Sequence, residues 1–315
     1  MTYTQPTLAD RFTGCLLGLA IGDAVGAQYE GQSADFLARR FGSVETLLEN
    51  IPPNGLYYTD DTQMAIGVAE TLIECRKIDE AVICKRFAGN YVPHRGYGRG
   101  ARVILEAMLA GEDHKWWAAN HFPGGSLGNG AAMRVAPVGL LFRNAHDLLW
   151  EQAKLSALPT HVHPLGIEGA QVLALAVALA SQSAPLNREE FFGRLAERCV
   201  SLEYAGPLRR AARIDNPKDL GLFGNGIEAA SSVVTALACF GLTPHSYEQT
   251  IGNAILLGGD TDTIAAMAGA VCGAHLGRSA IPETLLANLE NKYQGRDYIE
   301  ELARKLTEAH ASGVA

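Results

Sequence analysis

The sequence lacks both the long apolar runs of membrane proteins and the basic excess of nucleic-acid-binding proteins. No uninterrupted apolar run reaches the roughly 20 residues that a membrane-spanning helix needs. The 315 residues include 26 Lys and Arg against 34 Asp and Glu, a net charge of −8, which argues against a general affinity for nucleic-acid phosphates. We therefore expect neither membranes nor nucleic acids as partners, although a local phosphate pocket is compatible with this charge.

Signals for secretion and for disulfide bonds are also missing. The first residues, MTYTQPTLADRF, do not follow the basic-then-apolar order of a secretory signal. The six cysteines form no CxxC pair and are scattered through apolar segments, at Cys15, Cys75, Cys84, Cys199, Cys239 and Cys272. We expect them to be reduced and buried in a cytoplasmic protein.

Strand-like runs of alternating β-branched and aromatic residues are almost absent, whereas helical periodicity is frequent. In residues 64–76, for example, Met64, Val68 and Leu72 lie on one helical face. The same spacing predicts helices at 99–110, 131–143, 166–181, 187–200, 227–240, 246–257, 263–276 and 297–309. A hydrophobic content of 48% supports a substantial core, so the sequence predicts an all-α fold.

The segments between these helices include no long flexible linker, so we expect one compact domain over residues 1–315. The least regular stretches are rich in Gly, Pro or Asn: 51–61, 89–100, 111–130 and 212–226. Loops of this kind commonly line a functional site while helices hold them in place. They predict a cleft built from loops.

Small residues recur every four positions in two of the expected helices, at Gly14, Gly18, Gly22 and Gly26 and at Ala265, Gly269 and Gly273. Each interior glycine costs about 1 kcal/mol of helix propensity relative to alanine. A smooth stripe lets another helix backbone approach closely, which offsets this cost. We expect both helices to pack in the protein core.

Two acidic clusters precede apolar helices near opposite ends of the chain. They are Thr59, Asp60 and Asp61 in YYTDDTQMAIG, and Asp260, Asp262 and Thr263 in LLGGDTDTIAAMAG. Residues one or two positions apart diverge by about 100° or 200° within an α-helix, so each acidic pair converges only at a helix entrance. Helix capping is the alternative reading, because Asp and Thr are preferred N-caps.

The doubling of the carboxylates favours a metal site over simple capping. One cap needs one carboxylate, and a second beside it adds repulsion unless a cation is present. Hard oxygen ligands without Cys or His select Mg²⁺ or Mn²⁺ over Zn²⁺. The sequence therefore predicts a divalent-cation site.

Six sequence blocks, in family order across nearly the whole chain, resemble the ADP-ribosylglycohydrolase family. They are GDAVGAQYEG (22–31), YTDDTQMA (58–65), GGSLGNGAAMRVAPVGLLF (124–142), THVHPLGIEGA (160–170), GNGIEAASSV (224–233) and GGDTDTIAAMAGAVCGA (258–274). The chain is more similar to the ADP-ribosylhydrolases that act on serine-linked and other O-linked ADP-ribose than to the dinitrogenase reductase-activating glycohydrolases.

The resemblance implies a compact all-α fold with two Mg²⁺ ions, or Mn²⁺, in a central cleft. The implied metal ligands are Thr59, Asp60, Asp61, Asp260, Asp262 and Thr263. The implied catalytic residues are Glu30, Asp61 and Asp260, and we expect Glu30 to exchange a proton with the attacking water or the leaving oxygen. The implied substrate-binding residues are Gly125, Ser126, Gly128, Asn129 and His161.

The substrate-binding blocks also have simpler readings. GGSLGNG is either an ordinary Gly-rich turn or, opening a helix at 130–142, a cradle of backbone N–H groups for a diphosphate. His161 is either a loop histidine or a substrate contact, and for His163 we keep the structural reading. A solvated surface explains the local basic cluster at least as well as phosphate binding does, so we leave it outside the site: Arg95, Arg99 and Arg102.

Two features of the sequence bear on the substrate. Leu127 stands where serine-acting relatives typically carry Tyr, so a stacking or hydroxyl contact to ribose is either missing or supplied from elsewhere. The candidates for stacking on adenine or ribose are Phe122, Tyr97 and Phe223. Residues 91–105 contain no Asp or Glu to pair with an arginine acceptor. This lack of an acidic partner leans toward a hydrolase of O-linked ADP-ribose.

The expected partner is an ADP-ribosylated protein or a small ADP-ribose conjugate, and a self-contained cleft predicts a monomer. The alternatives are an arginine-specific hydrolase, a non-catalytic ADP-ribose-binding module and a metal-dependent phosphohydrolase. A structural role has no feature in its favour. The intact Glu30 and both Asp pairs argue against a pure binding module.

Overall fold

The computed structural model describes residues 5–182 and 186–313, and within these ranges it is built from helices. The α-helices are α1 (Leu8–Gly26), α2 (Ala34–Phe41), α3 (Val44–Glu49), α4 (Asp60–Cys75), α5 (Glu80–Asn90), α6 (Arg99–Ala110), α7 (His114–Asn120), α8 (Ala136–Leu141), α9 (His146–Ala157), α10 (Pro164–Ala180), α11 (Arg188–Arg198), α12 (Leu202–Ala211), α13 (Ala229–Leu242), α14 (Tyr247–Leu256), α15 (Thr261–Leu276), α16 (Glu283–Asn288) and α17 (Arg296–Ala311). Short 3₁₀ helices are η1 (Asn129–Ala131), η2 (Pro217–Phe223) and η3 (Arg278–Ala280).

The described ranges contain no β-strand, which confirms the all-α prediction. Isolated bridges join distant loops at three places: Ser33 with Gly258, Leu56 with Leu289, and Gly128 with Glu228. Two of these bridges, at Ser33 and Gly128, lie beside segments that carry predicted site residues. In the described part of the chain, no helix is both long and apolar enough to span a bilayer.

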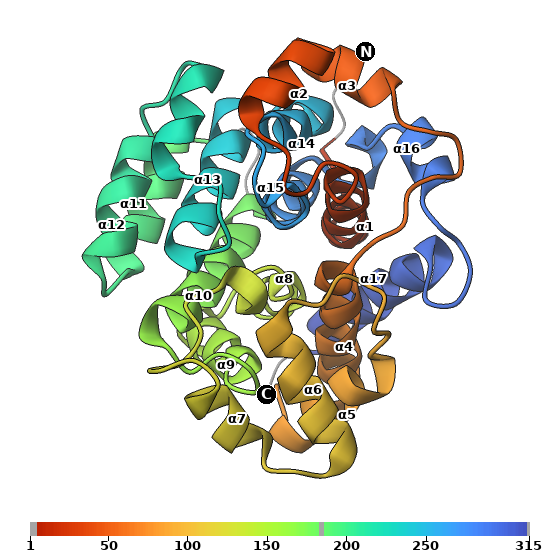
Figure 1. Cartoon of the computed structure of the whole chain (residues 1–315), viewed down its shortest axis with the longest axis vertical. Coiled ribbons are helices and arrows are strands. Elements are labelled where there is room, and N and C mark those ends of the chain that lie inside the picture. The colour runs from red at the N-terminus through yellow and green to blue at the C-terminus, as the bar shows by residue number, and fades with distance from the viewer. Residues whose placement is uncertain (1–4, 183–185, 314–315) are drawn as a thin grey trace.

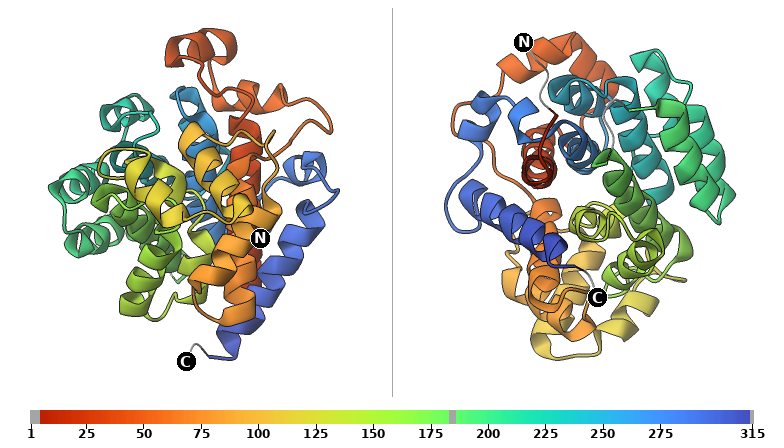
Figure 2. Two further views of the ribbon diagram at one scale, coloured as in Figure 1. Left: turned by 60° about the horizontal axis from the view of Figure 1, so that its bottom comes forward. Right: turned by 180° about the vertical axis from the view of Figure 1, so that it is seen from behind.

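Helices α1 and α15 lie side by side at the centre of the molecule, although they come from opposite ends of the chain (Figures 1 and 2). Their small residues face each other at backbone distance. A Cβ atom built at Gly18 would stand 2.4 Å from the Gly269 carbonyl oxygen, and one at Gly22 would stand 2.2 Å from that of Ala265. The two predicted stripes therefore form one interface, and glycine at positions 18 and 22 is what lets the backbones approach this closely.

The remaining helices surround this central pair. Helices α10, α13 and α14 pack against α15, while α17 packs against α1 and α4 (Figure 1). Both central helices are buried over most of their length because apolar or small residues occupy nearly every side. The ends of α1 and α15 are therefore held in place by the surrounding core.

Most predicted helices are confirmed, but the helix expected at 131–143 is wrong. This stretch holds η1, then turn residues, and then the short helix α8. Pro137, near the start of α8, lacks an N–H and disfavours helical backbone at the residue before it, so a helix restarts here rather than running through. Helices outside the predicted ranges are α2, α3, α5, α7, α9, α12 and α16.

The cysteine prediction holds for the absence of disulfides and only in part for burial. All six cysteines are free. Cys15, Cys239 and Cys272 are buried, whereas three others are partly exposed: Cys75 at the end of α4, Cys84 on α5, and Cys199 just after α11.

Candidate active site

A cleft of about 330 Å³ lies where the first turns of α4 and α15 meet the Gly-rich loop before η1. This volume is at the lower end of the range of small-molecule sites. Both acidic clusters reach it. The predicted metal and catalytic residues that line it are Glu30, Asp60, Asp61, Asp260, Asp262 and Thr263.

Asp60 and Asp61 are the first two residues of α4, so the chain is still entering the helix where their side chains leave it. The N-cap is Thr59, whose hydroxyl accepts a 3.4 Å hydrogen bond from Asp61 N–H. The Asp60 N–H donates to the carbonyl of Arg95 over 2.7 Å, which ties the helix start to the loop before α6. Neither carboxylate is the cap of α4.

On the opposite wall, Asp260 occupies the N-cap position of α15 without making a side-chain capping bond to any described residue. Asp262 follows in the first turn, and Glu30 lies in the turn that follows α1. The ligand oxygens of these three carboxylates lie within 4.8 Å of one another. Asp260 and Asp262 are buried and Glu30 is exposed. Asp262 Oδ1 accepts a 2.9 Å hydrogen bond from Thr263 N–H, but Asp260 makes no capping bond to the described part of the chain, so capping does not account for the whole of either acidic pair.

The electrostatics of the cluster favour a bound cation. Burial, with repulsion from Asp23, raises the pKa of Asp60 to about 7, and burial with repulsion from Asp260 raises the pKa of Asp262 to about 9. The same causes raise the pKa of Asp61 well above its usual value. Asp61 Oδ2 is buried with no hydrogen-bond partner among the described residues. An oxygen-only cluster with an orphaned carboxylate oxygen suits a hard divalent cation.

The Gly-rich loop approaches the cluster directly. Ser126, Gly128 and Asn129 line the cleft, and Ser126 Oγ accepts a 3.1 Å hydrogen bond from Gly128 N–H. The Asn129 amide donates to Asp260 Oδ2 over 2.6 Å and to Ser232 Oγ over 3.1 Å. Gly125 has φ +90°, and a Cβ there would lie 2.6 Å from the backbone nitrogen of His163. The loop leads into 3₁₀ helix η1, so the prediction that it opens an α-helix was wrong.

His161 is buried on the wall beside this loop. Burial, with the nearby Arg134 cation, lowers its pKa to about 3, so the ring is neutral at physiological pH. Its Nδ1 lies 2.7 Å from Thr160 Oγ1, and Arg134 Nη2 donates to that hydroxyl over 2.8 Å. His163 instead accepts a 3.2 Å hydrogen bond from Leu165 N–H as the N-cap of α10, consistent with its structural reading.

Of the three aromatic residues considered for stacking, Phe122 is the one that lines the cleft. It is 43% exposed and packs edge-to-face with His121, with ring centres 4.6 Å apart. Tyr97 is buried and donates a 2.8 Å hydrogen bond to Gln63, and Phe223 is buried in η2. Leu127 is 45% exposed.

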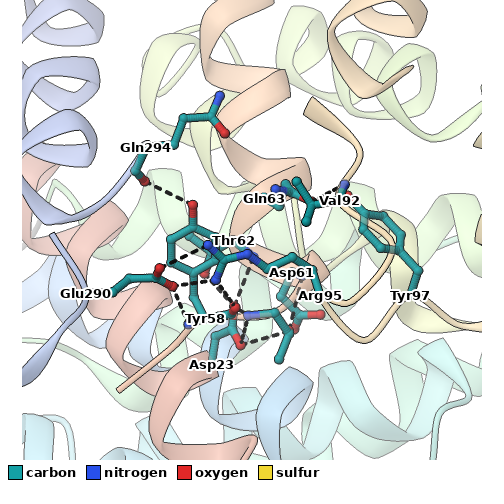
Figure 3. Close-up of polar contacts among 11 residues, drawn as sticks. Asp23, Tyr58, Asp61, Thr62, Gln63, Val92, Arg95, Tyr97, Glu290 and Gln294 are labelled. Atoms are coloured by element: carbon teal, nitrogen blue, oxygen red, sulfur yellow. Dashed lines mark hydrogen bonds and ion pairs between the residues drawn. The ribbon is translucent and has the colours of Figure 1, made fainter. Parts of the chain in front are cut away.

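Two arginines of the basic cluster, Arg95 and Arg99, lie in different environments. Arg99 lines the cleft. Arg95 pairs with Glu290, donates to the Tyr58 carbonyl over 2.6 Å, and lies 3.9 Å from the Tyr58 ring centre (Figure 3). This second arrangement holds the segment that leads into the first acidic cluster.

The sequence analysis missed Asp23, a fully buried carboxylate on α1 behind the acidic cluster. Its oxygens accept hydrogen bonds from Thr59 and Thr62 at the start of α4. The available signal was one acidic residue within the apolar, glycine-rich stretch 14–26 of α1. Thr59 is held by this carboxylate, since its hydroxyl donates to Asp23 Oδ1 over 2.8 Å.

Comparison with known proteins gives consistent results. A profile of the family described as ADP-ribosylglycohydrolase matches residues 4–314. The chain is 36% identical over 319 residues to mouse (Mus musculus) ADP-ribosylhydrolase ARH3, covering 87% of this chain and 86% of the mouse protein. Identity to the human (Homo sapiens) protein of that name is 34% over 336 residues, covering 92% of each. A solved structure described as an ADP-ribosylglycohydrolase-related protein complex superposes with a TM-score of 0.71 at 28% identity, covering 96% of this chain and 99% of that chain.

Proposed function

The chain belongs to the ADP-ribosylglycohydrolase family and is a glycosidic-bond hydrolase, and we propose that it releases ADP-ribose from oxygen-linked acceptors with divalent cations in its acidic cleft. The observation that carries the proposal is the meeting of carboxylates from both ends of the chain beside a Gly-rich loop. The chemistry is cleavage of the bond between the distal ribose and a protein side chain or small conjugate.

The acidic residues fit a pair of Mg²⁺ or Mn²⁺ ions. Asp60, Asp61, Asp260 and Asp262 offer carboxylate oxygens from two facing helix starts, and the Thr263 hydroxyl adds a neutral oxygen. The Thr59 hydroxyl is the sixth proposed ligand. When bound, such cations neutralise the cluster, bind ribose hydroxyls and activate a water.

Glu30 is suited to proton transfer because it differs from the other carboxylates. It is exposed at the cleft and lies on a turn rather than on a helix. Burial of part of the side chain and repulsion from Asp260 raise its pKa. A raised pKa favours the protonated acid and makes the carboxylate a stronger base, and glycoside hydrolysis requires a carboxyl group that exchanges a proton with the attacking water or the leaving oxygen.

The loop and the wall beside it are suited to the ADP portion of the substrate. Gly128 and Gly130 leave room at the cleft surface because neither carries a side chain. His161 presents a neutral ring beside them, with Nε2 about 3.3 Å from the position that a Cβ at Gly130 would occupy. Ser126 offers its hydroxyl to phosphate or ribose, and Phe122 offers an aromatic face to adenine.

The preference for an oxygen-linked acceptor rests on charge. The stretch 96–101 lines the cleft with Gly96, Gly98, Gly100 and Ala101, and its one charged side chain is the cation Arg99. An arginine acceptor would bring a second guanidinium to this wall, where it needs a carboxylate partner. The named relatives quoted above are ADP-ribosylhydrolases, in agreement with this chemistry.

A panel of ADP-ribose linkages tests the proposal. Serine-, arginine- and acetyl-linked ADP-ribose would each be incubated with the protein, in Mg²⁺ and in EDTA, and the products separated by chromatography. We expect free ADP-ribose from the oxygen-linked substrates in Mg²⁺ alone. Activity restricted to the arginine linkage would contradict the acceptor assignment, undiminished activity in EDTA would contradict the metal centre, and release of AMP or phosphate would indicate a phosphohydrolase.

A further inference from the structure

Asp23 is a fully buried carboxylate whose hydrogen bonds all go to one turn of another helix. Its oxygens accept from Thr59 N–H at 2.9 and 3.0 Å and from the Thr59 hydroxyl at 2.8 Å. They also accept from Thr62 N–H at 3.0 Å and from the Thr62 hydroxyl at 2.5 Å (Figure 3). Asp23 therefore fixes the residues on both sides of the Asp60–Asp61 pair.

These bonds form a helix cap supplied from a different helix. The first N–H groups of an α-helix have no partner inside it, and a carboxylate there is favoured by the helix dipole. Here the carboxylate belongs to α1. It therefore gives the first N–H groups of α4 a hydrogen-bond acceptor and also fixes the position of the start of α4 relative to α1. Because both Thr59 donors are engaged, the rotation of its side chain is fixed as well.

The same end of α1 also contacts the second acidic cluster. Gly26 is one turn beyond Asp23, and a Cβ built on it would lie 2.5 Å from the Asp262 Cα. The Thr261 hydroxyl donates a 2.8 Å hydrogen bond to the Gly26 carbonyl. One turn of α1 thus touches both helix starts that carry the predicted metal ligands.

A purely structural cap does not require this choice of residue. Burying a carboxylate costs free energy, and its negative charge repels Asp60 and Asp61 nearby. Serine or asparagine caps a helix without adding that repulsion. A buried charge in this position is favourable once cations occupy the cleft, because it adds to their attraction.

We propose that Asp23 is a positioning residue for the metal centre: it sets the first turn of α4 against that of α15 so that the two acidic pairs can share cations. The inference rests on the metal centre of the proposed function. Its action is indirect, through Thr59 and Thr62, in the manner of the outer partners that orient ligating side chains in other metal sites.

The test compares Asp23→Asn with Glu168→Gln, measuring Mn²⁺ binding by electron paramagnetic resonance and the melting temperature in EDTA and in Mn²⁺. Glu168 is a matched control, since it is a buried carboxylate that accepts from the Val200 and Ser201 N–H groups. We expect Asp23→Asn to weaken Mn²⁺ binding by about 10- to 100-fold and to reduce the Mn²⁺-induced rise in melting temperature. Glu168→Gln should shift both melting temperatures equally and leave Mn²⁺ affinity within about twofold.

A milder variant keeps the test decisive if Asp23→Asn does not fold. Thr62→Val removes one donor to Asp23 and leaves every predicted ligand in place, so Mn²⁺ affinity should fall by roughly threefold or more. Wild-type affinity in Asp23→Asn, or in Thr62→Val where Asp23→Asn does not fold, would overturn the inference, and so would an equal loss in Glu168→Gln. Failure of the unmodified protein to bind Mn²⁺ would instead contradict the proposed metal centre, and this inference with it.

Discussion

Asn129 donates a 2.6 Å hydrogen bond from its side-chain amide to Asp260, and so joins the Gly-rich loop to the acidic cluster. The same Asn129 amide also donates a hydrogen bond to Ser232 Oγ, which helps to fix the orientation of the side chain. Asn129 and Asp260 are both buried. A residue expected to bind substrate therefore also orients a proposed metal ligand, which couples the two halves of the cleft.

Removing this link should lower both activity and cation affinity. In Asn129→Ala the Asp260 carboxylate loses a charged hydrogen bond, which is worth about 1.5–3 kcal/mol. We expect kcat/KM to fall by about 10-fold or more, with weaker Mn²⁺ binding. Ser232→Ala is the control, because it leaves the bond to Asp260 intact, and its kcat/KM should change much less. Equal effects of the two variants would contradict a role for the Asn129–Asp260 bond.

The contact between α1 and α15 should be intolerant of a single added methyl group. A Cβ at Gly22 would stand 2.2 Å from the Ala265 carbonyl oxygen, so the central helices must separate in Gly22→Ala. We expect a loss of about 1–3 kcal/mol, or more, in the free energy of unfolding.

Gly193→Ala in α11 is the matched control for Gly22→Ala. No described neighbour lies within 4 Å of a Cβ built at Gly193, so the gain in helix propensity should stabilise the protein by about 0.5–1 kcal/mol. Urea unfolding in EDTA measures both variants without a contribution from bound cations. A stabilised Gly22→Ala protein would show that the interface can open without cost.

Glu30→Gln tests the proposed proton transfer. The substitution keeps the size of the side chain but removes its ability to exchange a proton, so kcat should fall by about 10²- to 10⁴-fold. Asp35→Asn, an exposed carboxylate in the first turn of α2, is the control and should retain kcat. Because Glu30 also lies near Asp260 and Asp262, Mn²⁺ affinity must be measured alongside. Near-normal turnover in Glu30→Gln would remove Glu30 from the catalytic step.

The metal-free protein should lose stability as the pH rises, and Mg²⁺ should reverse this. The folded-state pKa values of Asp60, about 7, and Asp262, about 9, lie above the unfolded value near 4. The folded protein therefore binds more protons than the unfolded chain, and the stability present at low pH is lost as pH rises through the folded pKa values.

The measurement is the melting temperature in Mg²⁺ minus that in EDTA, taken from pH 6 to pH 9. We expect this difference to grow with pH, because cations stabilise the charged carboxylates that destabilise the metal-free protein. The lowered pKa of His161 acts with the opposite sign, but it contributes equally in both buffers and cancels in the difference. A difference that is flat or falls with pH would contradict cation binding by these carboxylates.

Local sequence patterns were sufficient to predict the all-α fold, whereas the meeting of the two acidic clusters in one cleft was an expectation from the family resemblance. Helical spacing located α15, and the stripes at Gly18 and Gly269 indicated a close helix contact. What local patterns miss is pairing over long separations. Nothing near Asp23 in the sequence points to Thr59 and Thr62, 36 and 39 residues away.

Arg95 shows the same limit from the other direction. Its neighbours in the sequence suggest a solvated or phosphate-binding surface, but its partner Glu290 is 195 residues away. That pairing becomes visible only when the segment between α16 and α17 is folded against the loop before α6. The sequence shows that Arg95 is a cation. It does not show that the partner of this cation is Glu290, and this partner determines its role.

The last prediction concerns the protonation of His161. Since burial lowers its pKa to about 3, the imidazole should remain neutral at pH 5.5, where a histidine in the urea-unfolded chain is mostly charged. Thr160 Oγ1 accepts from Arg134, and its hydroxyl hydrogen is available to donate to His161 Nδ1. We therefore expect the ring proton on Nε2, the nitrogen that faces Gly128 and Gly130. Two-bond ¹H–¹⁵N spectra distinguish the tautomers, and Thr160→Val should remove the preference while leaving the ring neutral. A charged ring at pH 5.5, or a proton on Nδ1, would mean that His161 does not present an N–H donor to the cleft.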